Sequence, residues 1–433
     1  MEYNPHHDEY WNDAALEANM KQAFDICNGC RLCYNLCPSF PALFEIVEHY
    51  DNDATQVLPD ELNRVADLCY QCKLCYLKCP YIPPHHYDLD FPRLMLRSKV
   101  TRAKKRGLSR ADQFLGNPEK IGKMGQVAPG LANWSLKKPG LRKMMQRMYG
   151  IDYRRHLPAF APVRFSDWVR RHHQSTALAL DEVDVVIFST CTVEYHEVGI
   201  GQAVLKVLQH NGIRAAVPEG QVCCGMPALD GGDIAAAVQR ATANVALLAP
   251  YARANKPILA LQPTCALLLK QDYPTLVESE ESRIVAAQTK DVTQYLADAM
   301  KRGVLKKDFQ SGPGAVTYHL SCHTKAQGLK RAAKDLLESI DGCQVEVVDR
   351  CAGIDGTWGL KAEYYDEAIK VSAKLTERFA NRHDVKACSD CALAGLQIET
   401  ATDDRPVHPA EILARAYGLI GGSTGETTGA ERH

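Results

Sequence analysis

The chain has 433 residues, of which 46% are hydrophobic and 24% charged, and its formal net charge is −1 at pH 7. This length predicts two or three domains, and this composition is typical of a soluble globular protein. No apolar run approaches the roughly 18 residues of a membrane-spanning helix, and the acidic, polar N-terminus does not resemble a secretory signal. We therefore expect a cytoplasmic protein, and we expect no nucleic-acid partner.

Seventeen cysteines are many for a cytoplasmic chain. Structural disulfides are rare in a reducing compartment, so the cysteine count favours metal or redox chemistry. The spacing of the cysteines indicates which of these applies.

Two cysteine runs near the N-terminus share one spacing: residues 27–38 read CNGCRLCYNLCP and residues 69–80 read CYQCKLCYLKCP. In the pattern Cys-x2-Cys-x2-Cys-x3-Cys-Pro, three cysteines hold one [4Fe–4S] cluster and the fourth ligates the other cluster. Zinc also takes thiolates, but it has no use for the third closely spaced cysteine. The pattern predicts two crossed ligand sets, Cys27, Cys30, Cys33 and Cys79 for one cluster and Cys69, Cys72, Cys75 and Cys37 for the second.

The sequence between the two runs predicts helices. FPALFEIVEHY (40–50) reads as helical, and LPDELNRVADLCY (58–70) reads as a helix leading into the second run. We therefore assign residues 1–92 to a helical, ferredoxin-like domain that holds two clusters.

Residues 93–175 form a basic segment without cysteines, with 20 Lys and Arg against 4 Asp and Glu. FPRLMLRSKVTRAKKRG predicts a basic helix that ends at Gly107, and LANWSLKKPGLRKMMQRMYG predicts two short helices separated at Pro139-Gly140. One interpretation is an amphipathic hairpin that lies on an anionic membrane or a partner subunit. The competing interpretation is that its Trp, Leu and Met side chains pack on the protein's own core.

The remaining chain contains an internal repeat, with copies at 176–305 and 306–420 and a short flexible tail at 421–433. The first copy reads as the strand VDVVIFSTC, helices over 200–211 and 231–255, the strand KPILALQPTC and the helix KDVTQYLADAM. The second copy reads as the strand GAVTYHLSCH, a helix over 361–382, the segment VKACSDC and the helix HPAEILARAYG. Corresponding cysteines lie about 130 residues apart, which indicates two copies of one α/β unit.

Each copy carries four cysteines, placed where strands end or helices begin, the edge at which open α/β sheets gather their ligands. A five-thiolate unit would have a further cysteine at Gln262 in the first copy and at Ala352 in the second. Four thiolates suit either a [4Fe–4S] cluster or a zinc ion. His323 is a possible replacement ligand or a hydrogen-bonding neighbour, and Cys343 belongs to no set. The predicted ligand sets are Cys191, Cys223, Cys224 and Cys265 in the first copy and Cys322, Cys351, Cys388 and Cys391 in the second.

Two cysteine runs followed by duplicated Cys…Cys-Cys-Gly…Cys units resemble the iron–sulfur subunits of anaerobic glycerol-3-phosphate dehydrogenase and of glycolate and lactate oxidases. The cysteine-rich (CCG-type) proteins related to heterodisulfide reductase are also similar. The resemblance covers roughly residues 20–420, including YRRHLP at 153–158. It implies an α+β multi-domain fold, with a helical two-cluster ferredoxin-like domain followed by a duplicated α/β CCG-type domain. It also implies [4Fe–4S] clusters or zinc in the repeats.

We expect an iron–sulfur electron-transfer subunit that takes electrons from a flavoprotein dehydrogenase and passes them through [4Fe–4S] clusters towards quinone or another acceptor. Attachment to the inner face of the cytoplasmic membrane through the basic segment would bring the chain to quinone. The alternative is a heterodisulfide reductase-like thiol–disulfide oxidoreductase that uses a cluster in the repeats. That chemistry needs the paired cysteines and a closing Cys-x2-Cys in one copy, and neither copy has both. A third hypothesis makes the repeats zinc-stabilised scaffolds.

Overall fold

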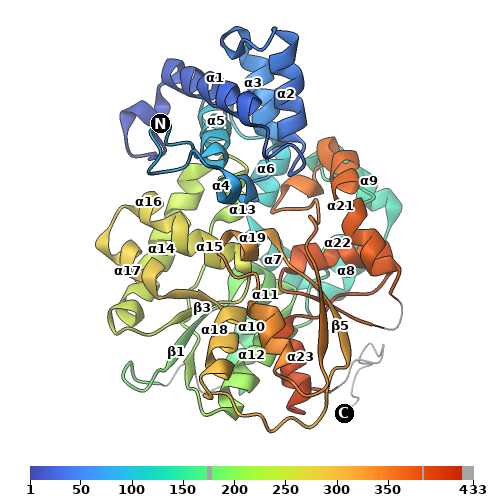
Figure 1. Ribbon diagram of the computed structural model, residues 1–433. Coiled ribbons are helices and arrows are strands. Elements are labelled where there is room, and N and C mark those ends of the chain that lie inside the picture. The colour runs from blue at the N-terminus through green and yellow to red at the C-terminus, as the bar shows by residue number, and fades with distance from the viewer. Residues whose placement is uncertain (173–177, 383–384, 422–433) are drawn as a thin grey trace.

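The computed structural model of the protein describes residues 1–172, 178–382 and 385–421. It combines a helical N-terminal part with two parallel sheets, which confirms the α+β fold class expected from the sequence. Figure 1 shows the N-terminal helices as a cap on one end of a body built around the two sheets. The predicted tail lies, from residue 422 onward, outside the described residues.

The N-terminal domain is a helix bundle around an apolar core that includes Phe24, Phe40 and Leu94. Helix α1 begins after Asn12 and helix α5 begins after Asp90, and each of these side chains accepts a backbone N–H bond of the first helical turn. The helices predicted between the cysteine runs are confirmed. The elements are η1 Asp8–Trp11, α1 Asp13–Cys30, α2 Ser39–His49, η2 Ala54–Gln56, α3 Pro59–Leu68, α4 Leu74–Lys78 and α5 Phe91–Arg106.

Short helices continue the chain from the end of α5 to the first sheet. The predicted break at Pro139-Gly140 is confirmed, because α8 ends at Leu136 and Pro139 is the first residue of α9. The elements are α6 Arg110–Leu115, α7 Pro118–Val127, α8 Pro129–Leu136, α9 Pro139–Tyr149 and α10 Phe165–His172.

Part of the positive charge of the basic segment is buried. Arg97 is fully buried and donates to the carbonyl oxygens of Glu9 and Tyr10, which ties α5 to the N-terminal turn. Arg142 is 4% exposed and donates to the carbonyl oxygens of Asp152 and Arg155. The two guanidinium groups supply hydrogen bonds to buried backbone carbonyl oxygens. These arginines are therefore not available to an acidic partner.

The first repeat is built on a four-stranded parallel sheet in the order β2-β1-β3-β4. Its strands are β1 Val185–Phe188, β2 Ala215–Ala216, β3 Ile258–Ala260 and β4 Thr289–Asp291. The helices that connect and cover them are α11 Thr190–Tyr195, α12 Val198–His210, α13 Met226–Asp230, α14 Ile234–Arg253, α15 Pro263–Gln271, α16 Tyr273–Val277, α17 Glu280–Gln288 and α18 Val292–Lys301.

The second repeat has a parallel sheet in the order β6-β5-β7, which matches β2-β1-β3 of the first. A parallel bridge between Cys388 and Val407 occupies the place of the fourth strand. Its elements are β5 Ala315–His319, α19 Cys322–Ala326, α20 Ala332–Glu338, β6 Gln344–Val348, η3 Trp358–Leu360, η4 Ala362–Tyr364, α21 Tyr365–Ala380, β7 Lys386–Ser389, α22 Ala392–Thr402 and α23 Pro409–Ala416. Strands β2, β4 and β6 are not among the elements expected from the sequence.

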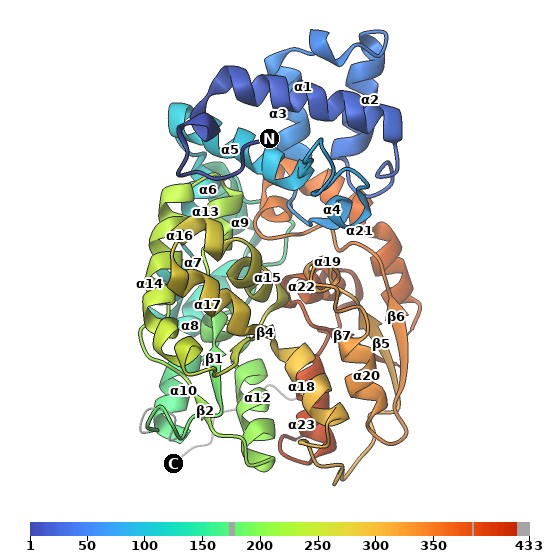
Figure 2. The same ribbon diagram turned by 60° about the vertical axis from the view of Figure 1, so that its left-hand side comes forward.

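The two repeats share one hydrophobic core. It contains Ile187 and Leu259 of the first sheet, Val316 of the second sheet, and apolar residues of α12, α18, α20 and α23 between them. Figure 2 shows α18 and α23 in this position between the two sheets. The repeats are therefore fused into one body. Within the described ranges, no helix combines the length and apolar character needed to cross a bilayer.

Candidate metal centres

The cysteines of the first N-terminal run lie around the end of α1. Cys27 and Cys30 are in its last turn, and Arg31 then takes a left-handed conformation, with φ 56°, that turns the chain towards Cys33. Burial raises the pKa of Cys27 well above its usual value, and the next largest cause is the charge of Cys79. The structure therefore brings the last cysteine of the second run beside the first run.

The second run shows the reciprocal arrangement. Cys69, Cys72 and Cys75 are buried. Burial raises the pKa of Cys37 to about 12, and the charge of Cys69 makes the next largest contribution to this shift. Burial also raises the pKa of Cys75, with contributions from Cys72, Cys69 and Cys37. Both sets of four thiols predicted from the sequence are thus brought together.

The four cysteines of the first repeat are in mutual contact. Sγ of Cys223 and Sγ of Cys191 are 3.8 Å apart. The pKa of Cys224 is raised well above its usual value, and its neighbours Cys223 and Cys265 are among the causes of the shift. Cys191 is positioned by Thr190, whose φ is 65°. Thiolates buried this close together repel one another, and a bound cation removes that cost. This set fits a metal centre.

A glycine follows the cysteine motif in each repeat for a steric reason. Gly225 has φ 104°, and a Cβ on it would lie 3.3 Å from backbone atoms of Ala237. Gly353 has φ 61°, and a Cβ would lie 2.3 Å from the carbonyl oxygen of Ala368. Only glycine tolerates this combination of left-handed backbone and close approach, so the motif glycines fix the loops that carry the cysteines.

The second repeat brings together three of its four predicted ligands. Burial raises the pKa of Cys322 well above its usual value, with further contributions from Asp355, Cys351 and Cys391. We call Cys322, Cys351 and Cys391 the second-repeat thiol set.

The structure does not place Cys388, the fourth predicted ligand, in this set. Cys388 lies inside β7 opposite Tyr318, it is fully buried, and it belongs to the hydrophobic core shared by the two repeats. Side chains alternate between the faces of a strand, and the position of Cys388 directs its thiol into that core. After burial, the charges of Asp390, Glu411 and Cys343 are the largest causes that raise the pKa of Cys388.

His323, a possible replacement ligand from the sequence, has both ring nitrogens engaged. Nε2 lies 3.2 Å from the carbonyl oxygen of Gln71, which can only accept, and Nδ1 lies 2.8 Å from the hydroxyl of Thr264. Burial lowers the pKa of His323 to about 4, so the ring is neutral. His323 therefore joins the N-terminal domain to both repeats by hydrogen bonds.

The second N-terminal run packs directly on the second-repeat thiol set. The hydroxyl of Tyr70 lies 3.5 Å from Sγ of Cys351, and Cys72 shares a buried cluster with Tyr70 and Trp358, against which Cys322 and Cys351 pack. Helix α4 contacts α19, as Figure 1 shows. The carboxyl edge of the second sheet thus meets the N-terminal domain.

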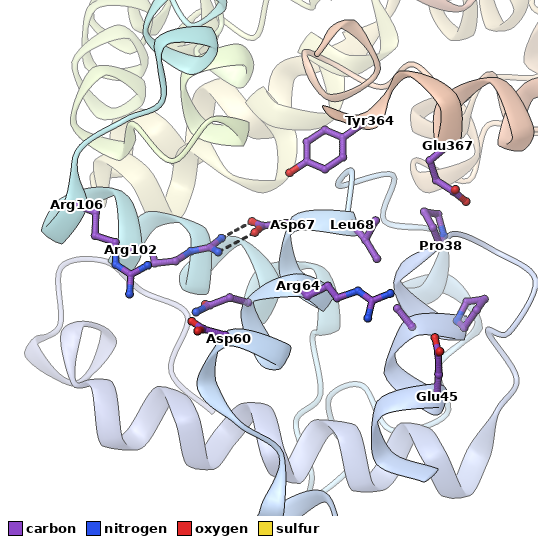
Figure 3. A pocket seen from close by; sticks show the side chains of 13 residues that line it. Pro38, Glu45, Asp60, Arg64, Asp67, Leu68, Arg102, Arg106, Tyr364 and Glu367 are labelled. Carbon is purple, nitrogen blue, oxygen red and sulfur yellow. Dashed lines mark hydrogen bonds and ion pairs between the residues drawn. The ribbon is translucent and has the colours of Figure 1, made fainter. Parts of the chain in front are cut away.

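A polar groove of about 600 Å³ borders this junction. Figure 3 shows the guanidinium of Arg102 paired with Asp67 on one side of the groove, and Tyr364 and Glu367 of the second repeat on the other. No cysteine lines it, so we assign it no metal chemistry.

A second cavity, of about 380 Å³, lies between the repeats and the connecting helices. Cys191, Cys224, Cys265 and Cys391 border it on one side. Apolar side chains of α6 to α9 and the segment after them border it on the other, including Phe114, Ile121, Leu136, Met145 and Phe160. Three of the four first-repeat cysteines, all but Cys223, therefore border a largely apolar space.

The domain composition agrees with this geometry. Residues 20–105 match the citrate utilization protein B Fer4-like domain, and residues 185–270 and 316–394 match the cysteine-rich (CCG) domain. The chain is an iron–sulfur protein with a Fer4-like domain followed by two CCG domains.

It is homologous to one of the subunits of the anaerobic glycerol-3-phosphate dehydrogenase of Escherichia coli (strain K12), with 26% identity over 304 residues that cover 70% of this chain and 76% of that protein. Lactate utilization protein A 2 of Bacillus mycoides (strain KBAB4) is 29% identical over 242 residues, which cover 53% of this chain and 98% of that protein. Lactate utilization protein A of Geobacillus kaustophilus (strain HTA426) is 28% identical over the same coverage.

Tyr70 and Asp355 are not among the site residues predicted from the sequence. Tyr70 follows a cysteine and had no local signal that distinguished it from a core aromatic residue. Asp355 is the one acidic residue in CAGIDGTWG (351–359), three residues after the Ala352 that replaces a cysteine. A cysteine replaced by Ala352 with an acidic residue close by was the sequence feature that could have identified Asp355 as a site residue.

Proposed function

We propose that this chain is the iron–sulfur electron-transfer subunit of an oxidoreductase and that it relays electrons between a flavoprotein dehydrogenase and an apolar acceptor. The observation that carries the proposal is the contact of the second N-terminal run with the second-repeat thiol set through Tyr70 and Cys351. Tyr70 and Cys351 are 281 residues apart in sequence, and the buried cluster there contains Cys72 of the second run, with Cys322 and Cys351 of the second repeat packed against it.

The N-terminal domain would hold two [4Fe–4S] clusters, which supply one-electron transfer when bound. The first cluster would take Cys27, Cys30, Cys33 and Cys79, and the second would take Cys37, Cys69, Cys72 and Cys75. The first-repeat cysteines and the second-repeat thiol set would hold further [4Fe–4S] or zinc centres.

Exposed apolar side chains support a partner surface at the first cluster site. Leu32 is 61% exposed, Tyr34 50% and Leu77 47%, and they alternate with cysteines of the two runs. Exposed aromatic and aliphatic groups are what a docking partner buries. The Escherichia coli relative is by its name one part of a larger glycerol-3-phosphate dehydrogenase, and we propose that a flavoprotein dehydrogenase docks here.

The cavity between the repeats is the proposed approach for the acceptor. It is lined mainly by apolar side chains, as a quinone ring and tail require. Its wall helices also present Val127, Trp134 and Met144 to solvent beside exposed lysines. An amphipathic surface of this kind binds anionic membranes, so the same helices would bring the cavity to a quinone-containing bilayer.

The first test is the iron, acid-labile sulfide and zinc content of anaerobically purified chain. We expect about eight irons from the N-terminal domain alone, and twelve to sixteen if the repeats also hold clusters. Cys79→Ser and Cys37→Ser should each remove about four irons, while Cys343→Ser should remove none. Equal iron in Cys79→Ser and in the unchanged chain would contradict the proposed ligand sets.

The second test asks where substrate chemistry resides. The purified chain alone should not oxidise glycolate, lactate or glycerol 3-phosphate, and reduced chain should pass electrons to a soluble quinone analogue. Turnover of these acids without a flavoprotein would contradict the subunit proposal. Direct reduction of a disulfide by the reduced chain would favour the thiol–disulfide oxidoreductase instead.

A further inference from the structure

Asp355 lies among the three cysteines of the second-repeat thiol set. Its carboxylate, Sγ of Cys322 and a ring nitrogen of His323 lie within 4.8 Å of one another. After burial, the Asp355 charge is the largest cause that raises the pKa of Cys322. Cys322, Cys351, Cys391 and Asp355 all line one small cavity. The carboxylate is thus the common neighbour of all three thiols.

Within the described ranges, no Lys or Arg lies within ion-pair distance of this carboxylate, and His323 is its one neighbour of that kind. The Asp355 side chain is 8% exposed, and its Oδ2 is buried without a hydrogen-bond partner. Its Oδ1 lies 3.8 Å from Nε2 of His323, which donates to another acceptor and is neutral. The nearby Lys73 pairs with Asp272, and Lys99 donates to a backbone carbonyl oxygen 2.6 Å away. A buried carboxylate in this state is costly unless a proton or a bound cation neutralises it.

The second-repeat thiol set is one ligand short of a four-coordinate centre. Ala352 stands where a five-thiolate unit would have a cysteine, and Cys388 lies in the hydrophobic core. A carboxylate oxygen is an accepted fourth ligand beside thiolates on zinc. A [4Fe–4S] cluster held by three thiolates has one iron without a protein ligand. A carboxylate oxygen can coordinate this iron, because iron binds oxygen ligands as well as sulfur.

We infer that Asp355 supplies the fourth ligand of the metal centre in the second repeat, beside the thiolates of the second-repeat thiol set. The inference rests on the part of the proposed function that gives this repeat a metal. It explains why the loss of a cysteine at Ala352 leaves a complete site: the missing thiolate is replaced by a carboxylate from the same loop.

The test measures metal content and coordination in four variants of the full chain, purified anaerobically. Asp355→Asn removes the charge at nearly constant shape, and Asp355→Cys offers a thiolate instead. Cys351→Ser is the reference for loss of the centre. Asp349→Asn is the matched control, because Asp349 lies in the same loop but is 56% exposed and pairs with Lys325. The N-terminal irons report in every sample that the chain is folded.

We expect the metal content of Asp355→Asn to fall by the same amount as that of Cys351→Ser, which is about one zinc ion or four irons per chain. The metal content of Asp349→Asn should not change. Asp355→Cys should keep the metal, and X-ray absorption at that metal's edge should show one oxygen ligand in the unchanged chain and only sulfur in this variant. Elemental analysis identifies the metal as zinc or iron.

Two results would overturn the inference in distinguishable ways. If Cys351→Ser loses metal and Asp355→Asn keeps the full content with unchanged absorption, the centre exists but Asp355 is not its ligand. If neither variant loses metal, the second repeat holds no centre, and the corresponding part of the proposed function fails with the inference.

Discussion

The hydroxyl of Tyr70 and Sγ of Cys351 lie 3.5 Å apart, so a residue between two cysteines of the second N-terminal run touches a cysteine of the second repeat. The Tyr70 ring also packs on Trp358, with centroids 5.0 Å apart. Hydrogen bonds to cysteine sulfur tune the reduction potential of a cluster. The contact therefore couples the proposed second cluster and the second-repeat centre in space and in electrostatics.

For a second-repeat centre that holds a [4Fe–4S] cluster, Tyr70→Phe should make its reduction potential more negative. The Tyr70 hydroxyl also donates to the carbonyl oxygen of Leu36, 3.3 Å away. A Cys351 thiolate can only accept, so it would share this proton, and the bond favours the more negatively charged, reduced state. Loss of about 1 kcal/mol of such stabilisation corresponds to roughly 40 mV for a one-electron couple. Redox titration followed by EPR measures the shift. Tyr364→Phe is the control, because Tyr364 also stacks on Trp358, and an equal shift in both variants would contradict the prediction.

Trp358→Ala should loosen the junction between the N-terminal domain and the repeats. Trp358 is 1% exposed and donates from Nε1 to the carbonyl oxygen of Asp67, 3.0 Å away. Truncating a buried Trp costs about 3–5 kcal/mol. We expect a clearly lower thermal midpoint and faster proteolysis after α5.

Trp134→Ala is the matched control for that substitution. Trp134 is 52% exposed, and exposed positions usually change stability by no more than about 0.5 kcal/mol. Similar midpoints for the two tryptophan variants would show that the junction does not depend on Trp358.

Much of the candidate chemistry follows from local spacing. The Cys-x2-Cys-x2-Cys-x3-Cys-Pro pattern predicts both N-terminal thiol sets, including the exchange of Cys37 and Cys79, because the loop geometry is encoded within twelve residues. The contact of Tyr70 with Cys351 was not predictable in this way. It depends on how the N-terminal domain packs on the repeats, and no local pattern specifies a pairing 281 residues apart.

Cys388 shows where spacing misleads. The Cys-x2-Cys at 388–391 suggests two ligands of one centre, but β7 continues through Cys388 and the strand ends only at Ser389. Cys388 is therefore inside the strand, whereas Cys391 follows the strand and caps the start of α22. Strand length depends on pairing with β5, and tertiary pairing is not visible in a short segment.

Cys388→Ala should consequently keep the full metal content. It removes a buried sulfur from the core, and we expect a loss of about 1 kcal/mol in stability from the small cavity. Cys391→Ala should instead lose metal from the second-repeat centre. Metal analysis and thermal unfolding of the two variants separate the roles, and metal loss in Cys388→Ala would restore the ligand assignment made from the sequence.

Some apolar side chains of the basic hairpin pack inside the protein and others are exposed, so each of the two interpretations drawn from the sequence holds for part of it. Leu136 and Met145 line the cavity, whereas Trp134, Met144 and Met148 are exposed. Periodicity could not separate these groups, because both faces of the short helices carry apolar side chains. The packed face and the exposed face thus belong to the same helices.

Charge reversal on this hairpin should weaken binding to anionic vesicles. Lys138, Lys143 and Arg147 are exposed, and each basic residue near an anionic surface contributes about 1 kcal/mol, so the triple Glu variant should bind roughly a hundredfold more weakly. Co-sedimentation with anionic and with zwitterionic vesicles measures this. Arg142 is excluded because it is buried. Unchanged sedimentation of the triple variant would exclude the hairpin as the membrane contact.

Asp291→Asn should stabilise the protein above neutral pH. Burial, with a further contribution from Asp390, raises the pKa of Asp291 from 3.8 to about 7. The unfolded state releases this proton near pH 4 and the folded state only near pH 7, so the folded protein loses stability across that window and the loss is complete above it. Asparagine does not titrate, and its Oδ1 can still accept from the N–H of Thr293, as Asp291 does at 2.8 Å.

The advantage of Asp291→Asn over the unchanged chain should therefore grow by about 1 kcal/mol between pH 6 and pH 8, since each pKa unit corresponds to about 1.4 kcal/mol. Thermal midpoints at both pH values measure it, in a range where the metal centres stay bound. Asp298→Asn, an exposed position on the same helix, should show no such trend. A constant difference between Asp291→Asn and the unchanged chain at both pH values would mean that Asp291 in the folded protein does not titrate between pH 6 and pH 8, which would contradict the prediction drawn from its burial.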